Sequence, residues 1–143
     1  MSWSGRKLLV NFVSNADPRG RGNVMRSRGS EQGFQPPTDI YQTSDSIVVR
    51  VEIAGMSAEE INLSIDESSG RLTVSGTRND PAGDEPRRYV NVEIDCGEFV
   101  RTIQLPRPVN AEDAQAGYDQ GFLVVRLPLR APNEAQSRNV PIG

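Results

Sequence analysis

Apolar and polar residues alternate along several short stretches in the middle of the chain. In the stretch 47–53, Ile47, Val49, Val51 and Ile53 alternate with Val48, Arg50 and Glu52. The stretches 61–66, 72–74, 99–105 and 123–127 repeat this pattern. A period of two is typical of strands that bury one face. The pattern therefore predicts an all-β domain over about 38–129.

Turn residues separate these stretches. Ser68-Ser69-Gly70 and Asp119-Gln120-Gly121 each join two alternating runs, as expected of hairpins. Two one-turn helices are predicted, one capped by Ser57 with Glu60 three residues later, the other by Asn110. Short strands divided by turns indicate a β-sandwich.

A long loop, about 79–97, interrupts the strands. Its first half is rich in Pro, Gly and acidic residues, and its second half alternates again from Tyr89 to Ile94. A strand at the tip of such a loop packs poorly on its own sandwich, but it can pair with an edge strand of a second subunit. The predicted dimer-loop residues are Tyr89, Val90, Asn91, Val92 and Ile94.

Residues 1–37 form a separate N-terminal arm that is rich in Gly, Arg, Ser and Asn. Such a composition buries too little apolar surface to offset its ordering entropy, so we expect a flexible segment. Either its apolar residues tuck onto the sandwich or they meet partners, and a short amphipathic helix over Ser4–Val13 is a further alternative. These residues are Trp3, Leu8, Leu9, Val10, Phe12, Val13 and Phe34.

Charge narrows the choice of partners. The whole chain carries −3, with 16 basic and 19 acidic residues. The arm holds six basic and two acidic residues, which gives +4, and the remaining ten basic and seventeen acidic residues give −7. We therefore expect no specific nucleic-acid partner. The sequence lacks the roughly 20 consecutive apolar residues of a membrane span, and we expect a cytoplasmic protein.

Few residues suit catalysis. The chain has no histidine and one cysteine, Cys96, so Ser/His and Cys/His pairs, Cys/His zinc sites and intrachain disulfides are excluded. Cys96 is either a small packed side chain or a redox-active thiol. The sequence also lacks a phosphate-binding loop of the GxxxxGK type. We expect no enzyme, cofactor or metal; paired carboxylates across a cleft are the enzymatic alternative.

Three segments, in this order, resemble the small heat-shock protein (α-crystallin) family of the bacterial and plant type. "IAGMSAEEINLSIDESSGRLTVSGTR" at 53–78 is similar to its strand, helical turn and Leu-x-Val-x-Gly-x-Arg segment. "GEFVRTIQLP" at 97–106 resembles its Phe-x-Arg strand, and "GFLVVRLP" at 121–128 its Gly-x-Leu-x-Val-x-x-Pro signature. Ala54 and Leu129 depart from the usual residues.

The resemblance implies an immunoglobulin-like sandwich whose loop strand is exchanged between two subunits, with dimers that assemble into larger homo-oligomers. It implies an ATP-independent holdase that binds partly unfolded client proteins, here through the arm residues named above. The alternatives are a CS-domain-like co-chaperone, which would lack the exchanged strand and the tail motif, and a non-catalytic β-sandwich interaction module, which would be a monomer with a secretory leader and without an apolar arm.

The C-terminal extension, 130–143, is polar except for Val140-Pro141-Ile142. Proline favours an extended chain before it, so Val140 and Ile142 share one face. The resemblance implies that this motif docks on a neighbouring subunit between the strands at about 61–66 and 114–119. Leu63 and Ile65 are either residues of that docking groove or residues of the core.

Overall fold

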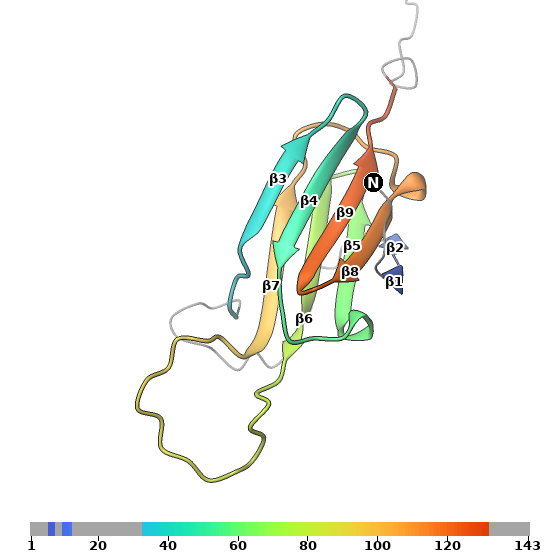
Figure 1. Cartoon of the computed structure of the whole chain (residues 1–143). Coiled ribbons are helices and arrows are strands. Elements are labelled where there is room, and N and C mark those ends of the chain that lie inside the picture. Colours follow the sequence, from blue (N-terminus) through green and yellow to red (C-terminus); the bar gives the residue numbers. More distant parts are fainter. Residues whose placement is uncertain (1–5, 8–9, 13–32, 132–143) are drawn as a thin grey trace, which may run out of the picture.

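The chain folds as a sandwich of two β-sheets in a computed structural model that describes residues 6–7, 10–12 and 33–131 (Figure 1). One sheet has the strand order β1-β8-β9-β4-β3 and the other β2-β5-β6-β7. The strands are β1 Arg6–Lys7, β2 Val10–Phe12, β3 Thr38–Gln42, β4 Ser46–Glu52, β5 Ile61–Asp66, β6 Arg71–Arg78, β7 Gly97–Gln104, β8 Gln115–Asp119 and β9 Phe122–Pro128. The all-β sandwich predicted from the sequence is confirmed.

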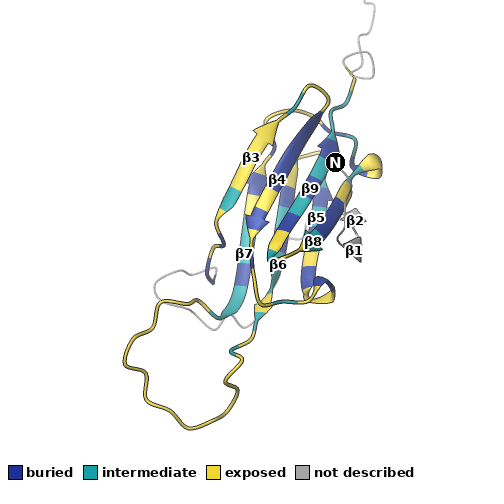
Figure 2. Ribbon diagram, viewed as in Figure 1, coloured by how far each residue is buried: buried dark blue, intermediate teal, exposed yellow. Residues whose placement is uncertain are grey.

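The period-two stretches are the strands that line the core. On β4, Ile47, Val49 and Val51 are fully buried, whereas Arg50 and Glu52 are exposed. Val48 points to the outer face and is buried as well. Its register partners Tyr41 on β3 and Arg126 on β9 flank it on that face. The buried residues of both sheets form one core cluster, and Figure 2 marks the buried positions along the strands.

Two turns of helix fix the ends of the strands, as predicted. They are η1, Ala58–Glu60, and η2, Ala111–Asp113. At η1 the Ser57 hydroxyl donates to Glu60 Oε1 at 2.7 Å. The cap predicted at η2 is wrong, because the Asn110 side chain makes no capping hydrogen bond there. Glu67 accepts the Ala111 N–H at 2.9 Å instead, from the turn after β5.

The N-terminal arm contains strands where the helical alternative placed a helix. β1 pairs antiparallel with β8, and β2 pairs parallel with β5. Both strands therefore lie on the same side of the sandwich, each extending a different sheet (Figure 1). The predicted helix over Ser4–Val13 is therefore wrong for residues 6–7 and 10–12. Their backbone groups pair with the edges of β8 and β5 and not with one another within a helix.

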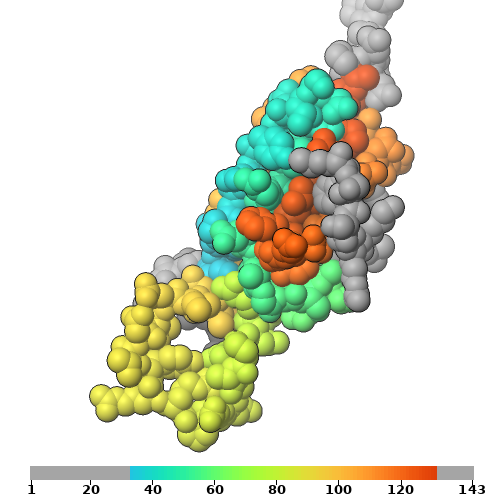
Figure 3. Space-filling view, viewed as in Figure 1, coloured from blue at the N-terminus to red at the C-terminus, as the bar shows by residue number. Residues whose placement is uncertain are grey.

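The segment 89–94 is not a strand in this chain. The loop between β6 and β7 projects beyond the sandwich body, and Figure 3 shows it standing clear of the sheets. A strand needs a neighbouring edge for its backbone hydrogen bonds. Among the described residues, β6 pairs with β5 and β7, and no strand edge lies along 89–94. The predicted alternation is therefore present without the strand.

Candidate functional site

The surfaces that suit a binding protein lie along the two sides of the sandwich and on the loop between β6 and β7. On one side β5 and β8 pair with the short arm strands β2 and β1, and the other side is bounded by β3 and β7. The described residues contain no group of three or more Cys, Asp or Glu side chains that could hold a metal ion. Nor do they contain a helix long and apolar enough to cross a membrane.

On the first side, Leu63 and Ile65 of β5 are 1% exposed and belong to the core. Their alternation with the outward positions Asn62 and Ser64 directs both side chains between the sheets. The core alternative therefore applies to their side chains. What β5 offers to a binding segment is its second backbone edge, opposite the edge that pairs with β6, and β2 pairs with this edge here.

The edge of β8 completes this side. The Tyr118 hydroxyl donates to the Ile53 carbonyl at 2.6 Å, which ties β8 to the end of β4. The predicted strand at about 114–119 is thus present as β8, with its other edge paired to β9. The outer edges of β5 and β8, one from each sheet, form a backbone slot for added strands, and β2 and β1 of the arm pair with these edges in this structure.

The loop between β6 and β7 carries apolar side chains into solvent. Val90 is 98% exposed, Ile94 77% and Tyr89 55%, and Val92 is also exposed. A monomer gains nothing from exposing both Val90 and Ile94 on one loop, so the loop is a candidate contact surface. Asn91 lies among them and donates to the Glu93 carboxylate at 2.6 Å.

A polar cluster shapes the first half of this loop. Asp80 Oδ2 accepts a hydrogen bond from the Tyr89 hydroxyl at 2.6 Å and one from Arg87 at 2.9 Å. Arg87 also donates to the backbone carbonyls of Ala82 and Gly83. The Tyr89 hydrogen bond, then that of the Ala82 N–H and the charge of Arg87, hold the pKa of Asp80 below its usual value. Tyr89 is therefore held in place by the base of the loop.

The opposite side of the sandwich ends in β3, whose outer edge is unpaired among the described residues. Ile40 and Tyr41 on this strand are 45% and 41% exposed. Asp39 forms an ion pair with Arg50 on the neighbouring strand β4. An edge strand with exposed apolar side chains can accept a further strand.

Phe34 was predicted to be a client-binding residue of the arm, and the structure contradicts this. It is 6% exposed, and its ring lies 5.4 Å from the Phe99 ring, centroid to centroid. Its N–H donates to the Glu98 carbonyl at 3.2 Å. Gly33 has φ +77°, and a Cβ there would come within 2.1 Å of Glu98 O, so only glycine permits this approach. Phe34 is a core residue of the sandwich.

Arg78 joins Phe34 to the base of the loop. Its guanidinium carbon lies 4.8 Å from the centre of the Phe34 ring, and its Nε donates to the Asp95 carbonyl at 3.0 Å. Its Nη1 donates to the Ala54 carbonyl at 3.2 Å. The sequence signal for Arg78 is the Gly-x-Arg segment at the end of β6, which belongs to the family resemblance but does not by itself predict these contacts. Cys96, one residue beyond Asp95, is a half-buried free thiol.

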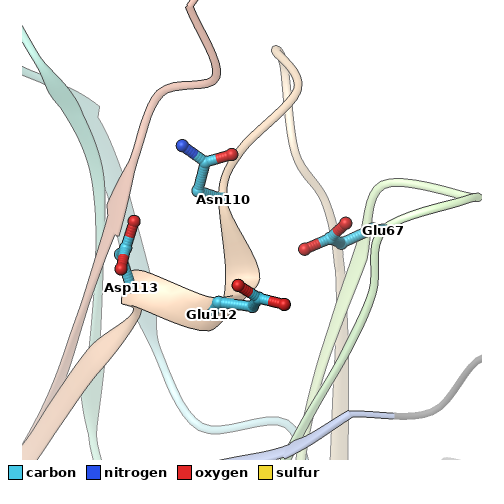
Figure 4. A pocket seen from close by; sticks show the side chains of 4 residues that line it. All are labelled: Glu67, Asn110, Glu112 and Asp113. Carbon is cyan, nitrogen blue, oxygen red and sulfur yellow. The ribbon is translucent and has the colours of Figure 1, made fainter. Parts of the chain in front are cut away.

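An acidic hollow lies where the C-terminal extension leaves the sandwich. Figure 4 shows Asn110, Glu112 and Asp113 around η2, facing Glu67 from the turn after β5. Both carboxylate oxygens of Glu67 have partners: one accepts the Ala111 N–H and the other forms an ion pair with Arg130 at 2.9 Å. The hollow therefore anchors the start of the extension.

The remaining predicted site residues belong to the arm and the tail, and most of them lie outside the described residues. Trp3, Leu8, Leu9 and Val13 of the arm and Val140, Pro141 and Ile142 of the tail lie outside the described residues. Val10 and Phe12 are placed by strand register only, opposite Leu63 and Ile65 of β5.

Comparisons with known proteins agree on one family. The family model described as the Hsp20/alpha crystallin family matches residues 39–143. The 16.9 kDa class I heat shock protein 1 of Triticum aestivum is 31% identical over 105 residues, which cover 73% of this chain and 69% of the wheat protein. Small heat shock protein C2 of Rickettsia felis is 26% identical, covering 81% and 73%.

Solved structures of similar proteins have a similar fold. Heat shock protein 16.0 from Schizosaccharomyces pombe superimposes with a TM-score of 0.64 at 26% identity, covering 82% of this chain and 80% of that one. A small heat-shock protein from Xylella fastidiosa gives 0.63 at 23% identity, covering 78% and 98%, and supports the fold. With its sandwich, its loop and this match over 39–143, the chain belongs to the Hsp20/alpha-crystallin family of small heat-shock chaperones and is not an enzyme.

Proposed function

We propose that the protein is an ATP-independent holdase that binds partly unfolded proteins through its N-terminal arm and prevents their aggregation. The observation that carries this is its family membership, and the apolar residues dispersed in the sequence of the arm support it. Unfolding proteins expose apolar surface, and a flexible segment with dispersed apolar residues adapts to many such surfaces. Many arms on one oligomer raise the affinity by multivalency.

The client-binding residues that we propose are those of the arm without Phe34. That side chain is buried against Phe99, so a client reaches it only if the sandwich opens. The set is Trp3, Leu8, Leu9, Val10, Phe12 and Val13. The proposed division of the chain accordingly has the arm end before Gly33, followed by the sandwich to about 129 and the extension from 130.

The test is a deletion of residues 1–32 that keeps Gly33 and Phe34 in place. We expect suppression of the aggregation of a heated client protein, per subunit, to fall severalfold while the far-UV circular dichroism of the sandwich is retained. A matched control replaces Arg19 and Arg21 with Gln, which changes the charge of the arm but none of its apolar residues. Undiminished protection by the deletion variant would contradict the proposal.

We also propose that two subunits exchange the segment 89–94, which would add to the unpaired edge of β3 on the partner. Two features of the chain support this proposal: the loop exposes an apolar run, and the outer edge of β3 is unpaired among the described residues. In the exchanged form Val90 and Ile94 would leave water, and the backbone groups of the run would gain partners.

Sedimentation measures this step. Deletion of residues 80–93 is expected to convert dimers to monomers. The point variant Val90→Asp is expected to weaken the dimer, whereas Asp84→Asn at the exposed tip of the loop serves as its control. Dimers that persist unchanged after the deletion would exclude exchange through the loop.

The third part of the proposal concerns the tail. We propose that Val140-Pro141-Ile142 adds to the slot between β5 and β8 of a neighbouring subunit and so links dimers into a larger homo-oligomer. The variant Val140→Gly/Ile142→Gly is expected to shift the mass toward dimers, with Asn139→Ser as control. An unchanged mass would exclude the tail as the link.

We propose a cytoplasmic location, supported by the single cysteine, which cannot form an intrachain disulfide. Fractionation of the cells that make the protein tests it.

A further inference from the structure

The slot proposed for the tail is already filled by the arm of the same chain. Residues Val10–Phe12 form β2 and lie parallel to β5, with Val10 opposite Leu63, Asn11 opposite Ser64 and Phe12 opposite Ile65. These are the positions of β5 that the tail would need. The sequence pattern of the arm did not predict this pairing.

The arm also takes the second edge of the slot. Arg6 and Lys7 form β1, opposite Tyr118 and Gly117 of β8. One short segment therefore contributes a strand to each sheet and spans the side of the sandwich between β5 and β8 (Figure 1). Two edges in two different sheets meet the same segment, which distinguishes this contact from a chance bridge at one strand.

The edge of a strand accepts one neighbour. Each outward N–H and C=O of β5 forms its ladder hydrogen bond with a single added strand, so two segments cannot occupy positions 63–65 together. The arm and the tail also match in spacing. Val10 and Phe12 are two residues apart, as are Val140 and Ile142, and a strand places positions two apart on the same face.

From this register we propose that the edge of β5 at Leu63–Ile65 is a shared binding site, held by Val10–Phe12 of the chain's own arm and open to a tail only when the arm leaves. This inference rests on the proposed docking of the tail. Arm release then does two things at once: it frees apolar residues of the arm for clients and it frees the edge for assembly.

The size of the effect follows from the fraction of time that the edge is free. The apparent dissociation constant of the tail is its intrinsic constant divided by that fraction. An arm docked nine-tenths of the time weakens the tail about tenfold, and a permanently docked arm abolishes its binding. Because the arm is tethered to the sandwich, it competes at a high effective concentration.

A reversible lock tests the proposal. Asn11→Cys and Ser64→Cys place two thiols at register partners. Paired strands lie about 4.8 Å apart, which is within the Cα separation that a disulfide requires. The background carries Cys96→Ser and Val140→Gly/Ile142→Gly, which removes the native thiol and the protein's own tail motif. The probe is a fluorescent peptide of residues 136–143, QSRNVPIG, and fluorescence anisotropy measures its binding to the oxidised and the reduced protein.

We expect an intramolecular disulfide, a loss of at least tenfold in peptide affinity on oxidation, and full recovery with reductant. The two single-cysteine variants should show no such change, and a peptide with Gly at positions 140 and 142 should not bind. Equal affinity of the locked and the reduced forms would overturn the shared site. A disulfide that forms between subunits, or not at all, would overturn docking of the arm on its own sandwich.

The same samples separate this inference from the function on which it rests. If the peptide binds neither form, the proposed tail docking fails and the shared site fails with it. Suppression of client aggregation by the reduced protein tests the holdase separately, since it needs a free arm and no tail. Protection in the reduced form together with unchanged peptide affinity would therefore overturn only the shared site.

Discussion

Phe34→Ala is expected to destabilise the sandwich strongly, although the residue lies in a stretch whose composition is that of a flexible arm. The side chain is 6% exposed, and its ring packs near the Phe99 ring and under the Arg78 guanidinium. Removal of the ring leaves a cavity against Phe99 and deprives Arg78 of its stacking partner.

The magnitude follows from the burial. Truncation of a buried Phe to Ala usually costs about 3–5 kcal/mol, the range depending on how far the site can collapse. Phe34 lies at the start of the described sandwich, and one backbone hydrogen bond, from its N–H to Glu98, holds it there. The chain can relax around it, so we expect the lower end, about 3 kcal/mol. For a domain of about 100 residues this lowers Tm by about 12–24 °C.

Urea unfolding followed by far-UV circular dichroism measures the change. The subunit concentration is held fixed, because assembly makes the apparent stability depend on it. Trp3→Ala is the matched control: it removes a larger aromatic side chain from the arm and is expected to leave the midpoint unchanged. A loss below about 0.5 kcal/mol for Phe34→Ala, the range of surface substitutions, would refute the assignment of this ring to the core.

Three further variants test other contacts. Gly76→Ala should destabilise by about 1–3 kcal/mol in the same assay, because its Cβ would lie 2.7 Å from a backbone oxygen and 2.9 Å from an aromatic ring; no loss would contradict this packing. Glu67→Gln should cost under about 1 kcal/mol, since it loses a partly exposed ion pair but still accepts the Ala111 N–H, whereas Glu67→Ala should cost about 1 kcal/mol more; equal losses would contradict the role of that hydrogen bond. The lowered pKa of Asp80 means that its stabilisation of the loop is complete above about pH 4 and is lost as the pH falls through the lowered pKa. Tyr89→Phe should raise that pKa in an NMR titration, and an unchanged midpoint would contradict the hydrogen bond as its main cause.

The strands that carry their own pattern were predictable from the sequence. β4, β5 and β9 alternate over six or seven residues, and the turns beside them contain the glycines that positive φ angles require at Gly70 and Gly121. Each of these strands buries one face against the opposite sheet, and this produces an alternation that is visible within the strand's own sequence.

The features missed have their cause elsewhere in the chain. β2 is three residues long, too short for a period, and its partner lies 53 positions away (63 − 10). Phe34 is a single apolar residue between a glycine and a proline-rich stretch, and the pocket that buries it comes from β7. The alternation at 89–94 was visible, but a strand there depends on an edge that this chain does not supply among its described residues.

The order of synthesis gives the β1–β8 pairing a further consequence. Arg6 meets Tyr118, 112 positions later (118 − 6), so β1 leaves the ribosome long before the strand that receives it. At about 5–20 residues per second, the growing chain carries an unpaired β1 for about 6–22 seconds. During that interval the apolar residues of the arm face the crowded surroundings of the polysome. The nascent chain therefore exposes apolar residues, as do the partly unfolded proteins that we propose it binds.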